Sequence, residues 1–233
     1  MATAQWGYQP VATLDDAARA DFILRVYQHL LAAVVAFVAF ETLLINLGAA
    51  EAMYDFVSSS GGSAWLLILG GFMIVNWLAT NAAHDILNPS RQYLGLFGLA
   101  GAEALIFAPF LHYVFEVEGG GAIASAAVVT ALGFGGLSAV AFTTRRDLSF
   151  LRPMLLWGGV CALVLIVGAV LFGFELGVWF SVGMIALAGG SILYQTQTIM
   201  RRYPSEAYVG AAVQLFASVM LLFWYVLRLF ARR

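Results

Sequence analysis

Long apolar stretches dominate the chain and are separated by short polar connections. Seven of them are long enough to cross a bilayer, which takes about 20 helical residues. They lie near residues 23–48, 64–83, 93–114, 121–143, 153–173, 176–200 and 207–230. Each must be helical, because a helix satisfies its own backbone hydrogen bonds in hydrocarbon without closing a barrel. The pattern therefore predicts an all-α polytopic membrane protein with seven transmembrane helices.

The polar start of the chain predicts an N-terminal tail and helix lead-in over residues 1–20, followed by one seven-helix domain over residues 21–233. In the segment TLDDAARADF, Thr13 is placed to cap a helix, with Asp16 three residues later. Asp21 and Arg25 are four residues apart and can form an ion pair on one helix face. Before this lead-in, which continues into the first span, we expect a short flexible tail.

Composition supports a lipid environment. The chain is 62% hydrophobic and 10% charged, whereas about a quarter of the residues of a soluble domain are charged. The net charge of -2 and the lack of a basic cluster argue against a nucleic-acid partner. Cys161 is the only cysteine, so no disulfide can form within the chain, and no metal-ligand cluster is visible. Because no nucleophile–base pattern or phosphate-binding loop is present either, we expect neither an enzyme nor a cofactor.

Arginine is concentrated in alternate connections. Eight arginines precede or begin the first span, or lie between spans two and three, four and five, and six and seven: Arg19, Arg25, Arg91, Arg145, Arg146, Arg152, Arg201 and Arg202. The other three connections contain acidic charges only. The positive-inside rule therefore predicts a cytoplasmic N-terminus. Arg228, Arg232 and Arg233 near the C-terminal end depart from the pattern. The alternative is one re-entrant span, which would place both ends inside.

Two acids lie well inside the predicted spans. Glu103 is at the middle of the third span, between small residues that allow a neighbouring helix to approach closely. Glu41 is nearer the outer face, in the first span. A carboxylate at membrane depth costs several kcal/mol, so it is usually paired, protonated or facing a cavity. Each acid is therefore either part of a proton or ion site, or a neutral acid hydrogen-bonded within the bundle.

Uncharged polar residues mark the last two spans. The short loop RRYPSEA joins these spans, so they must form an antiparallel hairpin. Gln195 and Gln214 are equally far from its centre, and Ser191 and Ser218 are equally far one turn deeper. We therefore expect the two amides to bond each other, with the serines stacked above them. The set is either an interhelical clamp worth about 0.6 kcal/mol per bond or the polar lining of a cavity.

Further polar residues run down the inner half of the second span and out of it: Asn76, Asn81, His84 and Asp85. They could extend the same polar region toward the cytoplasm. Neighbouring residues of a helix point in different directions, so His84 and Asp85 are not expected to share a metal ion.

Several motifs resemble a known family. They are DFILRVYQHLLAAVVAF in the first span, NPSRQYLGLFGLAG before the third, and ILYQTQTIMRRY, YVGAAVQLF and LLFWYVLRLF toward the C-terminal end. Together they are similar to the transmembrane Bax-inhibitor-motif family over almost the whole chain. The resemblance implies a multi-pass protein of the bacterial inner membrane. It also implies a fold in which the last of seven helices is central and the other six surround it in two groups of three.

For bacterial relatives the resemblance implies a pH-sensitive calcium leak, with a pair of aspartates on the last two helices as the sensor. The aligned positions here are Gln195, within Tyr194-Gln195-Thr196, and Ser218, and neither residue can change its charge with pH. The second span also lacks the arginine that would bind such an aspartate. The two-aspartate mechanism therefore does not transfer to this chain.

Other relatives bind a membrane-anchored AAA protease and its scaffold, or modulate cell death and calcium. Two hypotheses follow for this chain. The first is a non-enzymatic regulatory or accessory protein that binds a membrane protease or another large membrane complex, and the missing acid pair favours it. The second is a pH-sensitive leak channel for calcium or protons in which Glu103 supplies the charge. Glu103→Gln should abolish flux under the second hypothesis and leave binding intact under the first.

Overall fold

The computed structural model describes residues 9–144 and 146–231, apart from the side chains of residues 62 and 63. The first eight residues of the predicted tail lie outside this part, as do Arg145, Arg232 and Arg233 of the charge pattern. Within the described part, seven helices are long and apolar enough to cross a membrane. No strand occurs among these residues. The predicted all-α fold with seven spans is confirmed.

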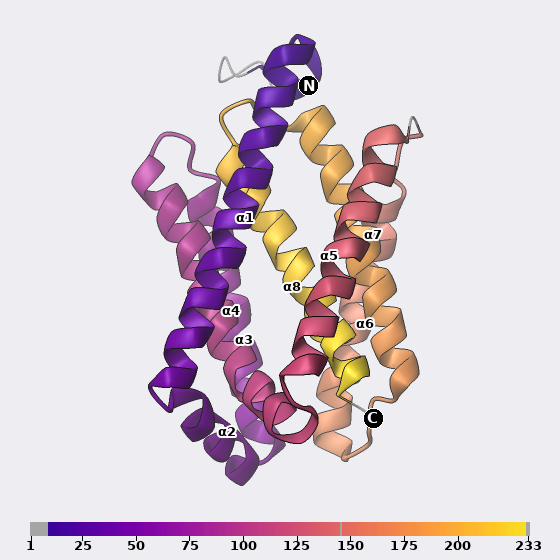
Figure 1. Cartoon of the computed structure of the whole chain (residues 1–233). Helices are drawn as coiled ribbons and strands as arrows, with labels where there is room; N and C mark the ends of the chain where they lie inside the picture. The colour runs from indigo at the N-terminus through magenta and orange to yellow at the C-terminus, as the bar shows by residue number, and fades with distance from the viewer. Residues whose placement is uncertain (1–8, 145, 232–233) are drawn as a thin grey trace.

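One 3-10 turn and eight α-helices follow one another along the described chain. Their bounds are η1 Val11–Thr13, α1 Asp16–Asn46, α2 Ala49–Ser60, α3 Gly62–Ala83, α4 Pro89–Glu118, α5 Gly120–Thr143, α6 Leu151–Phe172, α7 Val178–Arg202 and α8 Tyr208–Phe230. The predicted spans correspond to α1 and α3–α8. Helix α2 was not predicted. Its 12 residues are too few to cross a bilayer, and it lies across the lower end of the bundle (Figure 1).

The two chain ends lie at opposite ends of the bundle (Figure 1). The α3–α4, α5–α6 and α7–α8 connections share the end where α1 begins. Each of the seven spans is one continuous helix, which does not fit the alternative of a re-entrant span. Of the arginines that the structure describes, only Arg228 lies toward the other end, near the end of α8.

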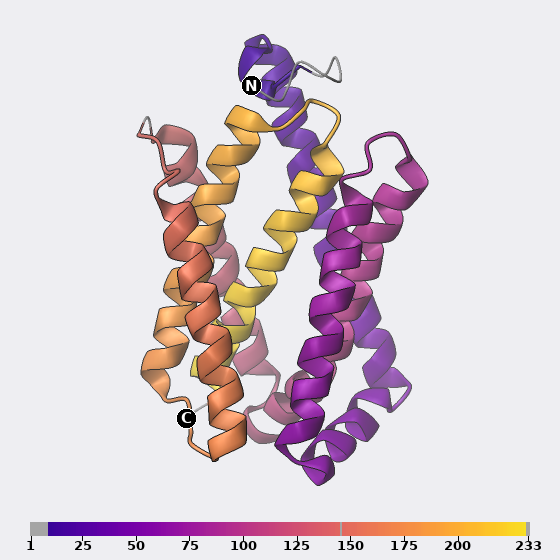
Figure 2. The same cartoon turned by 180° about the vertical axis from the view of Figure 1, so that it is seen from behind.

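Helix α8 is the centre of the fold. Of its most apolar stretch 72% is buried, against 6% for α6. It crosses the bundle diagonally, between a group formed by α1, α3 and α4 and a group formed by α5, α6 and α7 (Figures 1 and 2). It contacts α1, α3, α4, α5 and α7 directly. The arrangement that the family resemblance implied is therefore confirmed.

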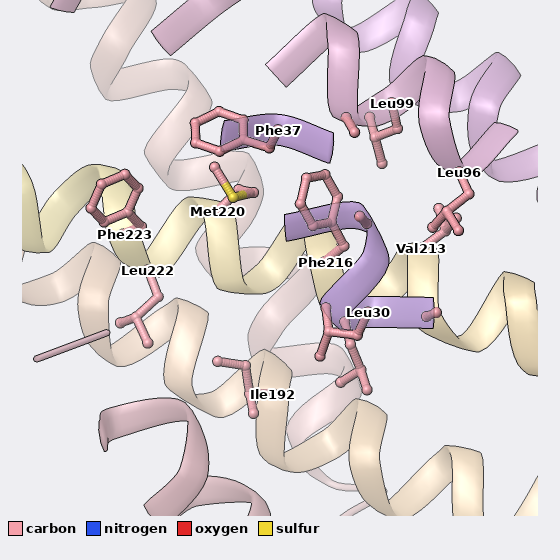
Figure 3. Close-up of a cluster of buried hydrophobic side chains, with 14 of the residues drawn as sticks. Leu30, Phe37, Leu96, Leu99, Ile192, Val213, Phe216, Met220, Leu222 and Phe223 are labelled. Carbon is pink, nitrogen blue, oxygen red and sulfur yellow. The ribbon is translucent and has the colours of Figure 1, made fainter. Parts of the chain in front are cut away.

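The buried core is built around α8 (Figure 3). Val213, Phe216 and Met220 of α8 are buried among side chains from α1, α4 and α7. Phe107 of α4 stacks on Phe223, with ring centroids 5.5 Å apart. In lipid these contacts stabilise the fold through close packing, because the hydrophobic effect does not drive helices together there.

Helices α3 and α4 approach so closely that a glycine is required between them. A Cβ atom added at Gly95 of α4 would lie 2.5 Å from the carbonyl oxygen of Ala79 and 2.8 Å from the backbone nitrogen of Ala83. Both contacts are with backbone, which cannot rotate away. Gly95 thus acts as a small interface residue of the kind that allows membrane helices to touch.

The chain before α1 is anchored to the α7–α8 connection. The Val11 N–H donates to the Tyr203 carbonyl at 2.9 Å, and the Ser205 N–H donates to the Gln9 carbonyl at 3.3 Å. Pro10 and Pro204 form an isolated bridge between these bonds, and Val11 is fully buried. From residue 9 onward the expectation of a flexible tail is therefore wrong, because this pairing holds the backbone in place.

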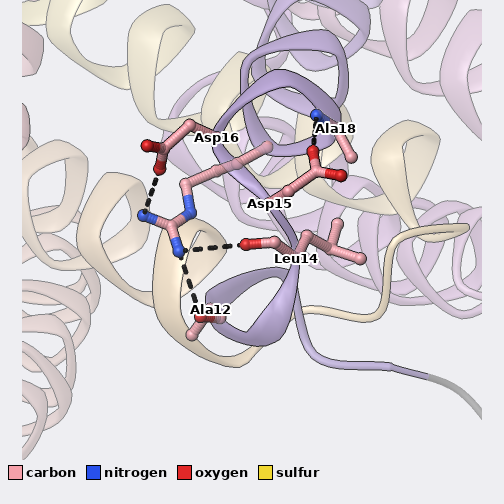
Figure 4. Close-up of polar contacts among 6 residues, drawn as sticks. Ala12, Leu14, Asp15, Asp16 and Ala18 are labelled. Carbon is pink, nitrogen blue, oxygen red and sulfur yellow. Dashed lines mark hydrogen bonds and ion pairs between the residues drawn. The ribbon is translucent and has the colours of Figure 1, made fainter.

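Asp15, and not the predicted Thr13, caps α1. The Asp15 carboxylate accepts a hydrogen bond from the Ala18 N–H at 2.7 Å (Figure 4). Thr13 lies in the 3-10 turn, where its hydroxyl donates to the Pro10 carbonyl at 2.8 Å. Because the turn occupies Thr13, the helix begins two residues later, at an aspartate that caps equally well.

Charged side chains also contact one another at the start of α1. The Arg19 guanidinium donates to the Ala12 carbonyl at 3.0 Å and lies 3.8 Å from the Asp16 carboxylate (Figure 4). The predicted pair of Asp21 with Arg25 is present at 2.9 Å. Both ion pairs are solvent-exposed, so their net stabilisation is small.

Candidate functional site

A neutral hydrogen bond joins the last two helices. The Ser218 hydroxyl of α8 donates to Oε1 of Gln195 of α7 at 2.9 Å. Ser218 is buried and Gln195 is half-buried. Ser191, one turn along α7, is half-buried and takes no part in this contact. The bond lies at the two positions where the family resemblance places titrating aspartates.

Gln214 belongs to a second polar cluster, nearer the α7–α8 connection. Its Nε2 lies 3.4 Å from Nε2 of His84, which also lies 3.2 Å from the Tyr203 hydroxyl. His84 Nδ1 lies 2.7 Å from the Thr80 carbonyl, which can only accept, so Nδ1 carries a proton. Burial raises the pKa of Tyr203, so its hydroxyl stays protonated.

The expected bond between the two amides is therefore wrong. Side chains lean toward the N-terminus of their own helix. On α7 this tilt carries Gln195 away from the loop, to Ser218, whereas on α8 it carries Gln214 toward the loop, to His84. Equal sequence distance from the loop thus leaves the two amides without contact. We also predicted that the second span extends this polar region. It does so through His84, which contacts Gln214.

Gln197 holds the α5–α6 connection, although we did not predict it as a site residue. Its Oε1 accepts from the Leu148 N–H and its Nε2 donates to the Arg146 carbonyl, both at 2.7 Å. The side chain is only 4% exposed. One amide thus satisfies a backbone donor and a backbone acceptor at once. The only sequence signal was a second amide, two residues after Gln195, near the end of an apolar helix.

Glu103 borders a cavity of about 860 Å³ between α3, α4, α6, α7 and α8. Asn76 and Ser218 border the same cavity, and so do Glu175 of the α6–α7 connection and Arg228 of α8. The Asn76 Oδ1 is buried and has no hydrogen-bond partner among the described residues. The structure therefore brings together three of the predicted residues, with carboxyl, amide and hydroxyl groups around one space.

Glu41 is separate from this group. It borders a second cavity, of about 610 Å³, between α1, α4, α5 and α8. The side chain is 5% exposed, and neither carboxyl oxygen has a hydrogen-bond partner in the described part of the chain. The cavity beside Glu41 is lined by α1, α4, α5 and α8 and the cavity beside Glu103 by α3, α4, α6, α7 and α8, so each borders α8 and helices of both groups.

The cavity beside Glu103 and the Gln195–Ser218 contact differ in their chemistry. Residues with oxygen-bearing side chains around Glu103 are suited to holding water or a hard cation, which prefers oxygen ligands. The Gln195–Ser218 bond can neither gain nor lose a proton. Among the described residues, no group of three or more His, Cys, Asp or Glu side chains is placed to hold a metal ion.

Seven spanning helices, six of them arranged around a buried last one with polar pairs along it, define a polytopic α-helical membrane protein. The sequence model described as "Inhibitor of apoptosis-promoting Bax1" matches residues 19–233. The chain therefore belongs to the Bax inhibitor-1 family, as the sequence resemblance implied.

Curated relatives of this chain come from bacteria. An uncharacterized protein of Pseudomonas aeruginosa is 34% identical over 61% of this chain and 65% of its own length. Escherichia coli YccA, named as a modulator of the FtsH protease, is 31% identical over 58% of this chain and 62% of its own length. An E. coli protein of the same name is described as an inner membrane protein. The matches thus span less than two thirds of the length of these relatives.

Proposed function

We propose that this chain is a non-enzymatic regulator of the bacterial inner membrane that works by binding another membrane protein, with a membrane-anchored FtsH-type protease as the partner class. The uncharged Gln195–Ser218 bond carries the proposal. A chain without the titrating aspartate pair of the family retains the seven-helix fold but cannot use that pair as a pH-dependent switch. The name of the relative YccA supplies the partner class.

The orientation that goes with this proposal places the start of α1 in the cytoplasm. Among the described arginines, most lie at that end of the bundle, on α1 and in or beside the α3–α4, α5–α6 and α7–α8 connections. Positive charge in short loops favours the cytoplasmic side. The anchored N-terminal segment and the α7–α8 connection would then form one ordered cytoplasmic surface for a partner.

The alternative function is a pH-sensitive cation leak through the cavity beside Glu103. It is supported by the unpartnered Asn76 oxygen and by Ser218 bordering the same space. Ionisable residues buried within a membrane often mark ion pathways or proton relays. Under this alternative the charge sensor lies on α4 rather than on the α7–α8 hairpin.

One reconstitution separates the two functions. The purified chain is placed in liposomes with and without a membrane-anchored AAA protease, and degradation of a membrane substrate is followed beside calcium and proton entry. The regulator hypothesis expects a changed degradation rate that Glu103→Gln retains, and no flux above empty liposomes. The leak hypothesis expects flux that Glu103→Gln loses. An unchanged degradation rate, with no co-elution of the two proteins, would contradict the regulator hypothesis.

A further inference from the structure

The cavity beside Glu41 is a groove that opens sideways between α1 and α5. Along α1 its lining extends from Tyr27 to Ile45. Leu31 and Val38 on this lining are 63% and 55% exposed, and Ala131 of α5 is also exposed. These residues lie within spanning helices, so their exposed surface faces the hydrocarbon of the bilayer. The groove is therefore accessible from the membrane.

The groove is closed at its inner end and apolar along its length. The Tyr27 ring contacts the rings of Phe134 and Phe142, with centroids 5.8 and 5.9 Å apart, which joins α1 to α5. Met220 and Phe223 of α8 line the interior of the groove. The groove is therefore apolar, and aromatic rings close it at the end where α1 begins.

Two polar groups in this apolar wall lack partners. Glu41 and Thr130 both border the groove and are only 5% and 4% exposed. Neither the Glu41 carboxyl oxygens nor the Thr130 hydroxyl has a hydrogen-bond partner within the described residues. Buried polar groups are normally hydrogen-bonded, because an unmade bond is costly in a dry environment. A molecule in the groove that donates a hydrogen bond would satisfy Glu41.

The size of the groove suits one small molecule. The distance along α1 from Tyr27 to Glu41 is roughly 21 Å, at 1.5 Å per residue. The cavity has a volume of about 610 Å³, within the range of roughly 300–1,000 Å³ that small-molecule sites occupy. A single extended acyl chain lying along α1 fits a space of this length and volume.

We propose that this groove binds one single-chain lipid amphiphile taken from the bilayer, with its acyl chain along α1 and a hydroxyl or ammonium head group donating to Glu41. Glu41 lies near the end of α1 that adjoins α2, so the head group enters from the leaflet on that side. Whichever its protonation state, the carboxyl group offers an oxygen that can accept a hydrogen bond. The site is independent of the Gln195–Ser218 contact and of the proposed regulatory function.

The test is photo-crosslinking of the whole protein in lipid nanodiscs with a diazirine-bearing hexadecanol, with labelled peptides mapped by mass spectrometry. We expect labelling concentrated in the α1 and α5 residues that line the groove. Unlabelled hexadecanol and hexadecylamine should compete about tenfold better than hexadecane, the effect of one hydrogen bond. Labelling spread evenly over all lipid-facing helices would overturn the proposal, since it would indicate the ordinary lipid annulus.

Matched variants distinguish labelling within the groove from labelling by ordinary surrounding lipid. Ala131→Trp fills the mouth of the groove from an exposed position and should reduce labelling about tenfold, whereas Ala139→Trp, exposed on the same helix but outside the groove, should leave it unchanged. Glu41→Leu should abolish the preference for polar heads, and Glu41→Gln should retain the preference for hexadecanol because an amide oxygen still accepts. Equal labelling of wild type and Ala131→Trp would contradict the proposal.

A last experiment asks whether protein covers the groove instead. Engineered cysteines at Val38 and Ala131, in a background where the exposed Cys161 is replaced by Ala, are oxidised in native membranes. The lipid proposal expects no disulfide-linked dimer through these positions. A dimer formed in high yield would show that a second copy occupies this face, and would overturn the proposal.

Discussion

The Ser218 hydroxyl lies 2.9 Å from Oε1 of Gln195 and donates to it, which bonds the central helix to its hairpin partner. A pair of carboxylates at these positions could be opened or closed by one proton, because like charges in contact cannot both stay ionised. A hydroxyl and an amide cannot respond in this way. The link between α7 and α8 is thus fixed, and any response of this chain to pH must originate elsewhere.

Removing the Ser218 hydroxyl should weaken the α7–α8 contact only slightly. We expect Ser218→Ala to lower the free energy of unfolding by about 0.6 kcal/mol, the average for interhelical hydrogen bonds in membranes. Unfolding in mixed micelles, followed by tryptophan fluorescence at several pH values, measures the loss. It should not depend on pH between 6 and 8, because neither partner titrates there. Ser191→Ala, on the same hairpin but outside the bond, should have no effect. A loss confined to one end of this pH range would show that a titrating group shares the site.

Removing the Gln197 amide should release the α5–α6 connection. In Gln197→Leu the Leu148 N–H and the Arg146 carbonyl lose their partner, which should cost about 1–3 kcal/mol if water cannot replace it. Hydrogen exchange of residues 146–150 should become faster while α8 stays protected. Thr198→Ala is the matched control, because the Thr198 hydroxyl bonds only within its own helix. Unchanged exchange in Gln197→Leu would mean that the connection is held by other contacts.

Adding one methyl group at Gly95 should force α3 and α4 apart. The new Cβ would meet backbone atoms of α3 at 2.5 and 2.8 Å, and overpacking of this kind costs about 1–3 kcal/mol. At Gly98, three residues later, nothing lies within 4 Å of such an atom. Gly98→Ala should therefore be neutral or stabilising, since alanine favours helix more than glycine. Thermal unfolding of the two variants compares them, and equal midpoints would contradict the close approach.

Tyr203 should make stability fall at alkaline pH. Its folded-state pKa is raised by burial, so folding favours the protonated phenol. The corresponding stability is complete below the unfolded pKa of about 10 and is lost as pH rises above it. Tyr203→Phe cannot ionise, so it should start about 1 kcal/mol less stable, having lost the bond to His84, and approach wild type as pH increases. Unfolding measured from pH 8 to 11 tests this, and parallel curves would contradict it.

The seven spans could be predicted because long apolar stretches have few alternatives to a membrane helix. Helix α2 could not, because a short amphipathic segment beside charged residues looks like an ordinary connection. The cap of α1 was misplaced by two residues, since Thr13 and Asp15 are both good caps and only the preceding turn distinguishes them.

Side-chain partners were harder to predict than helices. Gln195 and Gln214 were correctly placed on facing helices, but the tilt of their side chains gave each a different partner. Gln197 bonds backbone atoms of a distant loop, which have no sequence signature. The two cavities depend on how six helices pack against a seventh, and a pattern along one helix does not contain that information.

The position of α8 has a consequence for how this protein is made. The ribosome produces the chain from its N-terminal end, so the helix at the centre of the bundle enters the membrane after the six that surround it. Until then the space that α8 fills between the two groups of three is open to lipid, although α4 and α5 as well as α3 and α6 also touch directly. At roughly 5–20 residues per second, the segment at Val11 waits about 10–40 seconds for Tyr203, its backbone partner 192 residues further on (203 − 11). Completion of the bundle is therefore a late event in biogenesis, and the N-terminal segment is among the last parts of the fold to find its partner.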